Sequence, residues 1–273
     1  MPTGIQDTRD KYNSFFRNFH GKTKRHAKIS AIKLSVAEIL AIFALKKTPI
    51  DRPMNCKLVI FDLDGTLLDT IDDLATATNH ALQALHLPTH SREEYRLMVG
   101  NGVRRLWQRA LPEDLRTEAM VEAVGREFKP YYERHGADCT HPYDGIDALL
   151  DALTTAGIGV AVASNKYEEA VGPLVCHFFP TTRFAVVAGN RDGVPTKPHP
   201  AIVHRIMEAT GTTTDEILYV GDSAVDMQTA HAAGLTSCAV TWGFRPRTEL
   251  EAEHPDYVVD SPAEIAAIVG ITK

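Results

Sequence analysis

Residues 61–70, FDLDGTLLDT, place two carboxylates, Asp62 and Asp64, directly after a short apolar run. Asp and Gly are ordinary turn residues, so a D-x-D-G segment can simply end a strand. The same pair at the carboxyl end of a strand can bind a divalent cation, and a carboxylate there can act as a nucleophile. The rest of the chain must decide between these two interpretations.

Polar side chains also follow three other apolar runs that are typical of buried strands. In chain order they are Ser164, Asn165, Lys166, Lys197, Asp222, Ser223 and Asp226. The carboxyl ends of parallel strands meet at one edge of a sheet, and ligands bind beyond that edge. A turn explains each cluster singly, but it does not explain why four clusters converge. The convergence favours a catalytic site.

Apolar runs alternate regularly with amphipathic helical patterns. We expect strands at 57–61, 158–163, 184–188, 217–220, 237–240 and 257–259. We expect helices at 72–86, 145–155, from about 167, 201–209, 224–233 and 262–269. Such alternation predicts an α/β fold, a doubly wound parallel sheet with helices on both faces.

One connection is too long for a single crossover. Lys197 follows Ser164 by 33 residues, a distance typical of one βα step, whereas Ser164 follows Asp62 by 102. We therefore expect a helical cap inserted at 70–140, over a core made of 54–69 and 141–273. Its expected core residues are Leu97, Leu106, Trp107 and Phe128, with a break at Gly100-Asn101-Gly102.

Charge is unevenly distributed along the chain. Residues 1–53 hold 11 Lys and Arg against 4 Asp and Glu, and the remaining residues hold 18 against 31. The acidic part argues against a nucleic-acid-binding face. A basic segment followed by an amphipathic helical pattern could lie on an anionic membrane or resemble a transit peptide. We favour the interpretation of 1–53 as a basic extension without recognisable chemistry, upstream of a natural start at Met54, and we expect a chain beginning there to keep its activity.

Compartment and membrane association can also be argued from composition. The four cysteines are far apart and form neither a zinc motif nor a disulfide framework, which predicts reduced thiols in the cytoplasm. The apolar stretch in the extension contains Lys33 and Glu38 and is too short to span a bilayer. We expect no membrane span, and the sequence predicts no oligomeric state.

The convergent residues could move a phosphoryl group from an alcohol to water. Asp62, first after its strand, is the expected nucleophile. Asp64 is the expected acid for the leaving alkoxide and then the base that activates water. Ser164, Asn165 and Lys197 are expected to bind the phosphoryl oxygens, with Lys197 supplying a compact positive charge.

A divalent cation would neutralise charge on those oxygens. Mg²⁺ prefers oxygen ligands and keeps several waters, so the carboxylates of Asp62 and Asp222 and the carbonyl of Asp64 would suffice. Asp226, one helical turn after Asp222, is expected to orient these ligands or to bind the cation through a water molecule, and Ser223 is expected to support them.

Four segments, FDLDGTLLD, ASNK, the KP of TKPHP and GDSAVD, resemble the four motifs of the haloacid dehalogenase superfamily, in the same order. The resemblance covers about 54–269. VGNGVRRL and VGDSAVDMQTAHAAG look like its phosphoglycolate phosphatase group. This resemblance implies Mg²⁺-dependent hydrolysis with Asp62 as nucleophile and Asp64 as acid and base. A halide leaves without a proton, so Asp64 argues against dehalogenation.

The expected substrate is a small phosphate monoester, and 2-phosphoglycolate is the favoured candidate. Pyrophosphate, a nucleotide or a sugar phosphate stays open, as does a phosphosugar mutase; a binding module without catalysis is disfavoured because no motif residue is replaced. A carboxylate in the substrate calls for a facing cation. The cap and flap residues expected to set specificity are Asn101, Gly102, Arg104 and Arg245, with Arg105 and Lys166 as further candidates.

Overall fold

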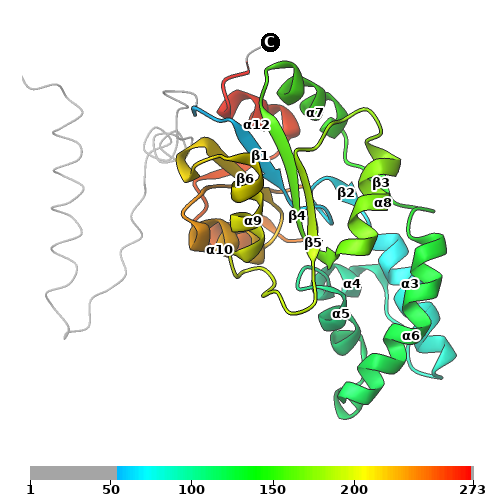
Figure 1. The fold of residues 1–273 in the computed structure, drawn as a ribbon. Coiled ribbons are helices and arrows are strands. Elements are labelled where there is room, and N and C mark those ends of the chain that lie inside the picture. The colour runs from blue at the N-terminus through cyan, green and yellow to red at the C-terminus, as the bar shows by residue number, and fades with distance from the viewer. Residues whose placement is uncertain (1–53, 272–273) are drawn as a thin grey trace, which may run out of the picture. The chain divides into compact units, whose positions relative to one another are not determined.

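The computed structural model describes residues 54–271, and its centre is a six-stranded sheet (Figure 1). All strands are parallel, in the order β5-β4-β1-β6-β7-β8. Their bounds are β1 Leu58–Phe61, β4 Gly159–Tyr167, β5 Val186–Asn190, β6 Ile217–Gly221, β7 Thr236–Val240 and β8 Tyr257–Val259. The predicted α/β class is confirmed. The expectations for residues 1–53 lie outside the described residues.

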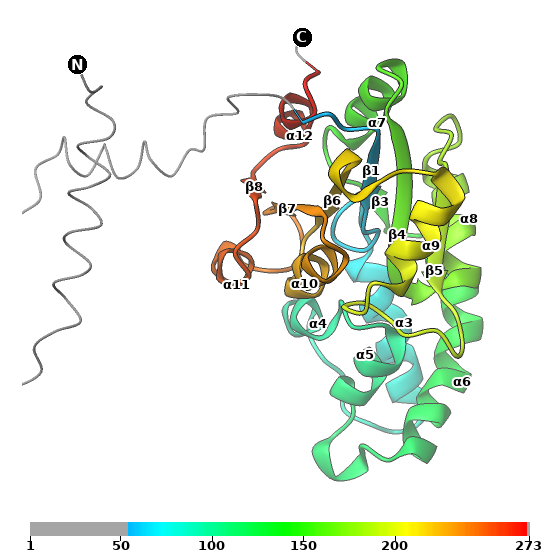
Figure 2. The ribbon, with the colours of Figure 1, turned by 60° about the vertical axis from the view of Figure 1, so that its left-hand side comes forward.

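Helices cover both faces of this sheet, as Figure 2 shows. They are α7 Ile146–Thr155, α8 Glu168–Phe178, α9 Ala201–Thr210, α10 Ala224–Ala233, α11 Arg247–Ala252 and α12 Pro262–Ile268. Strand β1 shows why both faces are buried. Val59 and Phe61 pack with α7, α8 and α12, whereas Leu58 and Ile60 pack with α9 and α10. A strand buried on both sides is apolar at every position, as its sequence LVIF is.

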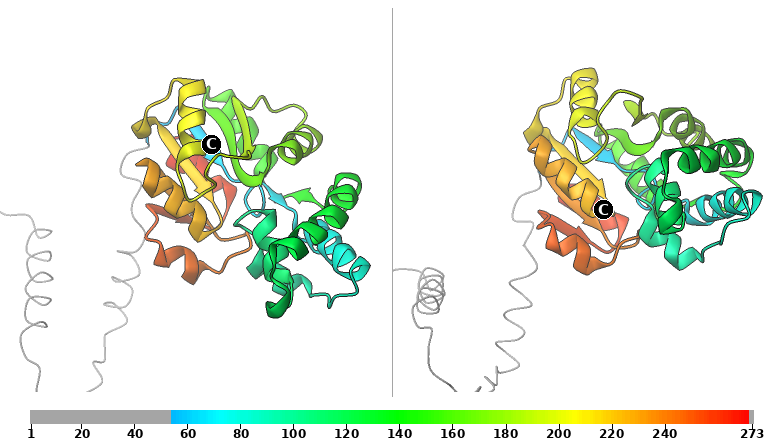
Figure 3. Two further views of the ribbon diagram at one scale, coloured as in Figure 1. Left: turned by 60° about the horizontal axis from the view of Figure 1, so that its bottom comes forward. Right: turned by 90° about the horizontal axis from the view of Figure 1, so that it is seen from below.

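A separate helical lobe is inserted between β1 and β4. It consists of α3 Ile71–Ala84, α4 Arg92–Met98, α5 Val103–Ala110 and α6 Glu118–His135, with a 3-10 turn at Glu113–Leu115. The lobe has its own core, in which Trp107 and Phe128 pack edge to face. It lies below the sheet in Figures 1 and 2 and beside the core in Figure 3. We call this lobe the cap.

Two short strands carry the chain into and out of the cap. Strands β2 Leu68–Asp69 and β3 His141–Pro142 pair antiparallel, with Leu68 opposite Pro142 and Asp69 opposite His141. The beginning and the end of the cap are therefore hydrogen-bonded neighbours. Among the described helices, none is long and apolar enough to cross a membrane.

Two details differ from the sequence-based expectation. Leu97, expected in the cap core, is 63% exposed, because the seven-residue helix α4 buries only Tyr95. That expectation is wrong. Strand β4 continues beyond residue 163 to Tyr167, and its register with β5 shifts between Ala163 and Tyr167. Ser164, Asn165 and Lys166 therefore lie in an irregular strand end rather than in a loop.

A buried carboxylate on α3 holds the returning chain. Asp73 accepts hydrogen bonds from the Cys139 and Thr140 amides, at 3.0 and 2.8 Å, and from the Thr140 hydroxyl at 2.7 Å. Asp73→Ala would remove the side-chain acceptor of both amides and would leave the Thr140 hydroxyl with only the Gly136 carbonyl, at 3.1 Å. We expect the free energy of unfolding to fall by about 2–4 kcal/mol, measured by urea denaturation.

The neighbouring Asp72 provides the matched control. Its side chain is 43% exposed and pairs with Arg92 at the surface. Asp72→Ala should cost at most about 1 kcal/mol, as for other exposed pairs. Equal costs for the two substitutions would show that the Asp73 contacts do not hold the cap's return.

Candidate active site

Asp62 lies at the end of the central strand β1 and is buried. Its Oδ1 accepts the Leu63 amide at 2.7 Å and forms an ion pair with Lys197 Nζ at 3.0 Å. Lys197 Nζ also donates to Asp226 Oδ1 at 2.7 Å and to the Ala163 carbonyl at 2.8 Å. Residues from four distant segments thus meet at one end of the sheet.

The loop that carries Lys197 is held by Asn165. Asn165 Oδ1 accepts the Lys197 amide at 2.9 Å, and its Nδ2 donates to the Lys197 carbonyl at 3.2 Å. The same Nδ2 also lies 3.2 Å from the Gly100 carbonyl in the cap. Asn165 therefore connects the lysine loop with the cap, and its amide is already occupied by these backbone groups.

Three buried carboxylates lie close together at this end of the sheet. Oxygens of Asp62, Asp222 and Asp226 lie within 4.8 Å of one another. Burial and the neighbouring carboxylates raise the pKa of Asp222 well above its ordinary value; burial also raises the pKa of Asp62, partly offset by Lys197. A divalent cation would relieve this repulsion, and the all-oxygen donor set suits Mg²⁺.

The partners of Asp226 distinguish it from the other two. Its Oδ1 accepts from Lys197, and its Oδ2 accepts from the Ser223 hydroxyl at 2.6 Å and amide at 3.1 Å. Asp226 therefore holds Lys197 and begins helix α10 together with Ser223. It makes no contact with Asp222 that would orient it, so Asp62 and Asp222 are the carboxylates left for a cation.

Two glycines that the sequence analysis did not single out allow Asp222 to approach. A Cβ on Gly65 or Gly243 would collide with the Asp222 side chain. Gly65 also has a φ of 91°, which favours glycine. The Phe244 amide donates to Asp222 Oδ2 at 2.7 Å. The DGT turn and the WGF segment therefore pack directly on this carboxylate.

Asp64 points into the site from the following turn. Its Oδ1 accepts from the Thr70 hydroxyl at 2.7 Å and from Lys166 Nζ at 3.0 Å. Burial alone would lower the pKa of Lys166, but Asp64 and Tyr132 raise it above its ordinary value, so the ammonium stays charged. Thr70 immediately precedes the cap and was not predicted as a site residue.

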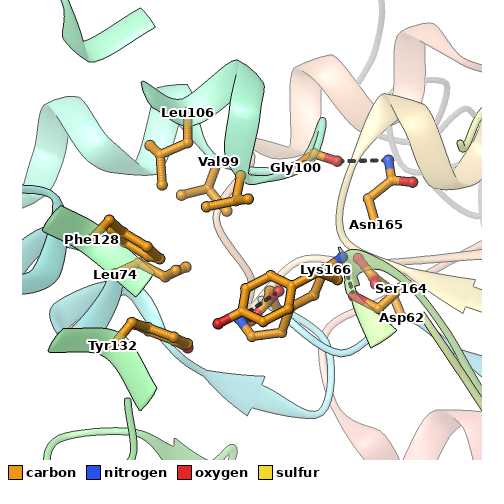
Figure 4. A pocket seen from close by; sticks show the side chains of 14 residues that line it. Asp62, Leu74, Val99, Gly100, Leu106, Phe128, Tyr132, Ser164, Asn165 and Lys166 are labelled. Atoms are coloured by element: carbon orange, nitrogen blue, oxygen red, sulfur yellow. Dashed lines mark hydrogen bonds and ion pairs between the residues drawn. The ribbon is translucent and has the colours of Figure 1, made fainter. Parts of the chain in front are cut away.

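The pocket beside these groups has two unlike walls (Figure 4). The core supplies polar residues, including Asp62, Asp64 and Ser164. The cap supplies an apolar wall and the glycines of its loop; these residues are Leu74, Val99, Gly100, Gly102, Val103, Leu106 and Phe128. The arrangement suits a ligand with one charged end at the core and a small remainder under the cap.

The structure does not bring every expected cap residue to the pocket. Arg104 is half exposed, pairs with Glu118 and Glu122, and does not line the pocket. Arg105 contacts Gln108 on the surface of the same helix. In this arrangement neither arginine faces the pocket.

Two other expected residues support the cap loop. Asn101 Oδ1 accepts from Arg109 at 2.7 Å. Arg245 donates to the carbonyls of Leu97 and Val99, at 3.0 and 2.6 Å, and so fixes the loop from the core side. Gly102 lines the pocket with a φ of 84°, and Lys166 is the expected cation that does reach it.

The fold agrees with comparisons to known proteins. Residues 59–240 match the haloacid dehalogenase-like hydrolases. A phosphoglycolate phosphatase of Vibrio parahaemolyticus is 35% identical over 223 residues, covering 80% of this chain and 98% of the relative. One of Pseudomonas syringae is 34% identical, covering 75% and 76%. A Haemophilus somnus structure described as a predicted phosphoglycolate phosphatase is 32% identical with a TM-score of 0.74, covering 78% and 98%.

The match spans both parts of the fold, from strand β1 through the cap to strand β7. The Vibrio parahaemolyticus relative aligns over nearly the whole of its own length. The four motifs found in the sequence lie within the aligned family region. The chain belongs to the haloacid dehalogenase-like hydrolases.

Proposed function

We propose that this protein hydrolyses a small phosphate monoester, 2-phosphoglycolate first, through an aspartyl-phosphate intermediate. The observation that carries the proposal is the position of Asp62. It is a buried carboxylate at the end of β1, 3.0 Å from the Lys197 ammonium and beside two further buried carboxylates. The names of the relatives point to the same substrate.

In the first half-reaction, an Asp62 carboxylate oxygen forms a bond to phosphorus while the bond from phosphorus to the ester oxygen breaks. Asp64 gives its proton to the leaving alkoxide. In the second half-reaction, Asp64 takes a proton from a water molecule, whose oxygen attacks phosphorus and displaces Asp62. Ser164 and Lys197 bind the phosphoryl oxygens in both half-reactions, so the same fixed donors stabilise the negative charge on these oxygens in each step.

The side chains of Asp62 and Asp222 and the main-chain carbonyl of Asp64 would hold a Mg²⁺ ion. When bound, it neutralises the charge that builds on the phosphoryl oxygens. The chain's own part is to keep Asp222 in place through the Phe244 amide and to keep Lys197 in place through Asp226. Among residues 54–271, Lys197 forms ion pairs with two of the three buried carboxylates, Asp62 and Asp226.

The proposal is tested with a panel of phosphate esters assayed with Mg²⁺ and again after removal of metal with EDTA. Phosphoglycolate should be hydrolysed with the highest kcat/KM of the panel, EDTA should abolish turnover, and added Mg²⁺ should restore it. Mg²⁺ should also raise the Tm, because it binds the folded state and relieves carboxylate repulsion. Asp222→Asn should weaken this Tm shift.

Three outcomes would contradict the proposal. A higher kcat/KM for pyrophosphate, a nucleotide or a sugar phosphate would show that this compound, and not phosphoglycolate, is the preferred substrate. Formation of an isomeric phosphate without release of inorganic phosphate would identify a mutase. Binding of esters without turnover, under conditions in which Mg²⁺ raises the Tm, would identify a binding module.

A further inference from the structure

Two tyrosines that line the pocket have hydroxyls that no residue among 54–271 satisfies. The hydroxyls of Tyr132 and Tyr167 are buried and have no hydrogen-bond partner in the described part of the chain. Both tyrosines line the pocket that also holds Asp62 and Asp64. A buried hydroxyl without a partner is costly and uncommon, so such a pair in a substrate pocket points to a ligand.

Tyr132 comes from helix α6 of the cap, on the side of the pocket opposite the nucleophile. Its side chain is directed toward the pocket in Figure 4, and the residue is 3% exposed. Burial raises its pKa to about 12, so the hydroxyl keeps its proton and is available as a donor. The remaining cap residues of this wall, such as Leu106 and Phe128, have no polar side-chain atom to offer.

Lys166 lies between this hydroxyl and the reacting centre. Its Nζ is 3.0 Å from Asp64 Oδ1 and 4.8 Å from the centroid of the Tyr132 ring. An ammonium has three donors, and in the described residues the hydrogen bonds of Nζ all go to Asp64. Lys166 therefore has donor capacity left, and it lies close enough to Tyr132 for each of the two groups to shift the pKa of the other.

The chemistry of the proposed substrate requires donors at this place. In phosphoglycolate a single carbon separates the leaving oxygen from the carboxylate, so a carboxylate must come to rest close to Asp64. A carboxylate under an apolar cap is strongly unfavourable unless it is paired and hydrogen-bonded. Arg104 and Arg105 are engaged at the cap surface.

We propose that the Tyr132 and Tyr167 hydroxyls, together with the Lys166 ammonium, bind the carboxylate of the leaving group and select substrates that carry one. The inference rests on the proposed function and adds to it the residues that determine specificity. Lys166 serves both ends of the substrate because it also contacts Asp64. The tyrosines serve only the carboxylate, and they give the inference its distinctive test.

The test compares two phosphonates that cannot be hydrolysed at the reacting bond. 3-Phosphonopropionate replaces the ester oxygen of phosphoglycolate with a methylene group, and propylphosphonate has a methyl group in place of the carboxylate. Their Kd values are measured by calorimetry with Mg²⁺ for the wild type, Tyr132→Phe and Tyr167→Phe. Tyr131→Phe is the matched control, since Tyr131 neighbours Tyr132 on α6 but stacks on His80 outside the pocket.

The wild type should bind 3-phosphonopropionate at least about tenfold more tightly than propylphosphonate. Tyr132→Phe should weaken 3-phosphonopropionate by about 10- to 100-fold, the range for a hydrogen bond to a charged group, and Tyr167→Phe should act in the same direction. The affinity for propylphosphonate should fall much less in both variants. Neither variant should lower the Tm, because each removes an unsatisfied buried hydroxyl; a merely structural tyrosine would lower it.

Two results would overturn the inference and they can be told apart. If the wild type prefers 3-phosphonopropionate but the tyrosine variants lose nothing, or lose equally on both phosphonates, the carboxylate is bound elsewhere and the proposed function stands. If the wild type does not distinguish the two phosphonates and the ester panel favours a substrate without a carboxylate, the inference and the substrate assignment both fail.

Discussion

Asp62→Asn is expected to lower the turnover of every phosphate ester by roughly 10⁴-fold or more while the protein stays folded. A neutral amide cannot attack phosphorus, and no other described carboxylate occupies the end of β1 facing Lys197 and Ser164. The measurement is steady-state hydrolysis of phosphoglycolate and of p-nitrophenyl phosphate. Far-ultraviolet circular dichroism and the Tm report on the fold.

The amide variant also changes the charge around Lys197, which keeps Asp226 as its partner at 2.7 Å. Near-normal turnover by a variant whose mass excludes deamidation would defeat the assignment of Asp62. Asp151→Asn is the matched control, because Asp151 is an exposed carboxylate on α7. Its turnover should equal that of the wild type.

Asp64→Asn should give the second large loss, about 10²- to 10⁴-fold on an alkyl phosphate, the range for general acid–base catalysis. The loss should be smaller on p-nitrophenyl phosphate, because its leaving group needs less protonation. An amide can still contact the Thr70 hydroxyl and Lys166, so the turn that carries residue 64 should keep its place. The measurement is kcat for phosphoglycolate and for the aryl ester.

Equal losses on the alkyl and aryl esters would contradict the role of Asp64 as an acid. A burst of p-nitrophenol followed by a slow steady rate would instead locate the defect in the second half-reaction, in which Asp64 acts as base. The Tm of the variant distinguishes either result from a loss of folded protein.

Much of the core could be predicted because its local signals agree with its packing. Helix α10 and strand β8 begin and end where the sequence pattern placed them. The strands are buried on both faces, so their apolar runs are continuous and clear. Each polar motif then follows a strand end directly, and the parallel sheet brings these ends together.

The cap could be predicted only as a helical insertion. Its helices α4 and α5 have only seven and eight residues, so which of their side chains are buried depends on tertiary contacts that a periodic pattern does not encode. Leu97 fits an apolar position but faces solvent. Arg104 follows the glycine loop in sequence, yet helix α5 turns it toward two glutamates of α6.

The supporting residues of the site were hidden for a different reason. Gly243 matters only because it packs on Asp222, a contact between segments that are distant in the chain. Tyr132 is typical of a buried helix position, and only the absence of a partner for its hydroxyl among the described residues distinguishes it. Neither property can be read from a single residue and its neighbours.

The paired strands β2 and β3 make the cap a module that can be exchanged. Because Leu68 lies opposite Pro142, the chain enters and leaves the cap at two adjoining backbone positions. Strands β2 and β3 can therefore pair regardless of which residues connect them. Domain insertion is tolerated where the two ends are close. A cap from another protein grafted between these strands would meet the core side chains Asn165 and Arg245, which hold the cap loop here. Reaction chemistry and substrate choice can therefore evolve separately in this architecture.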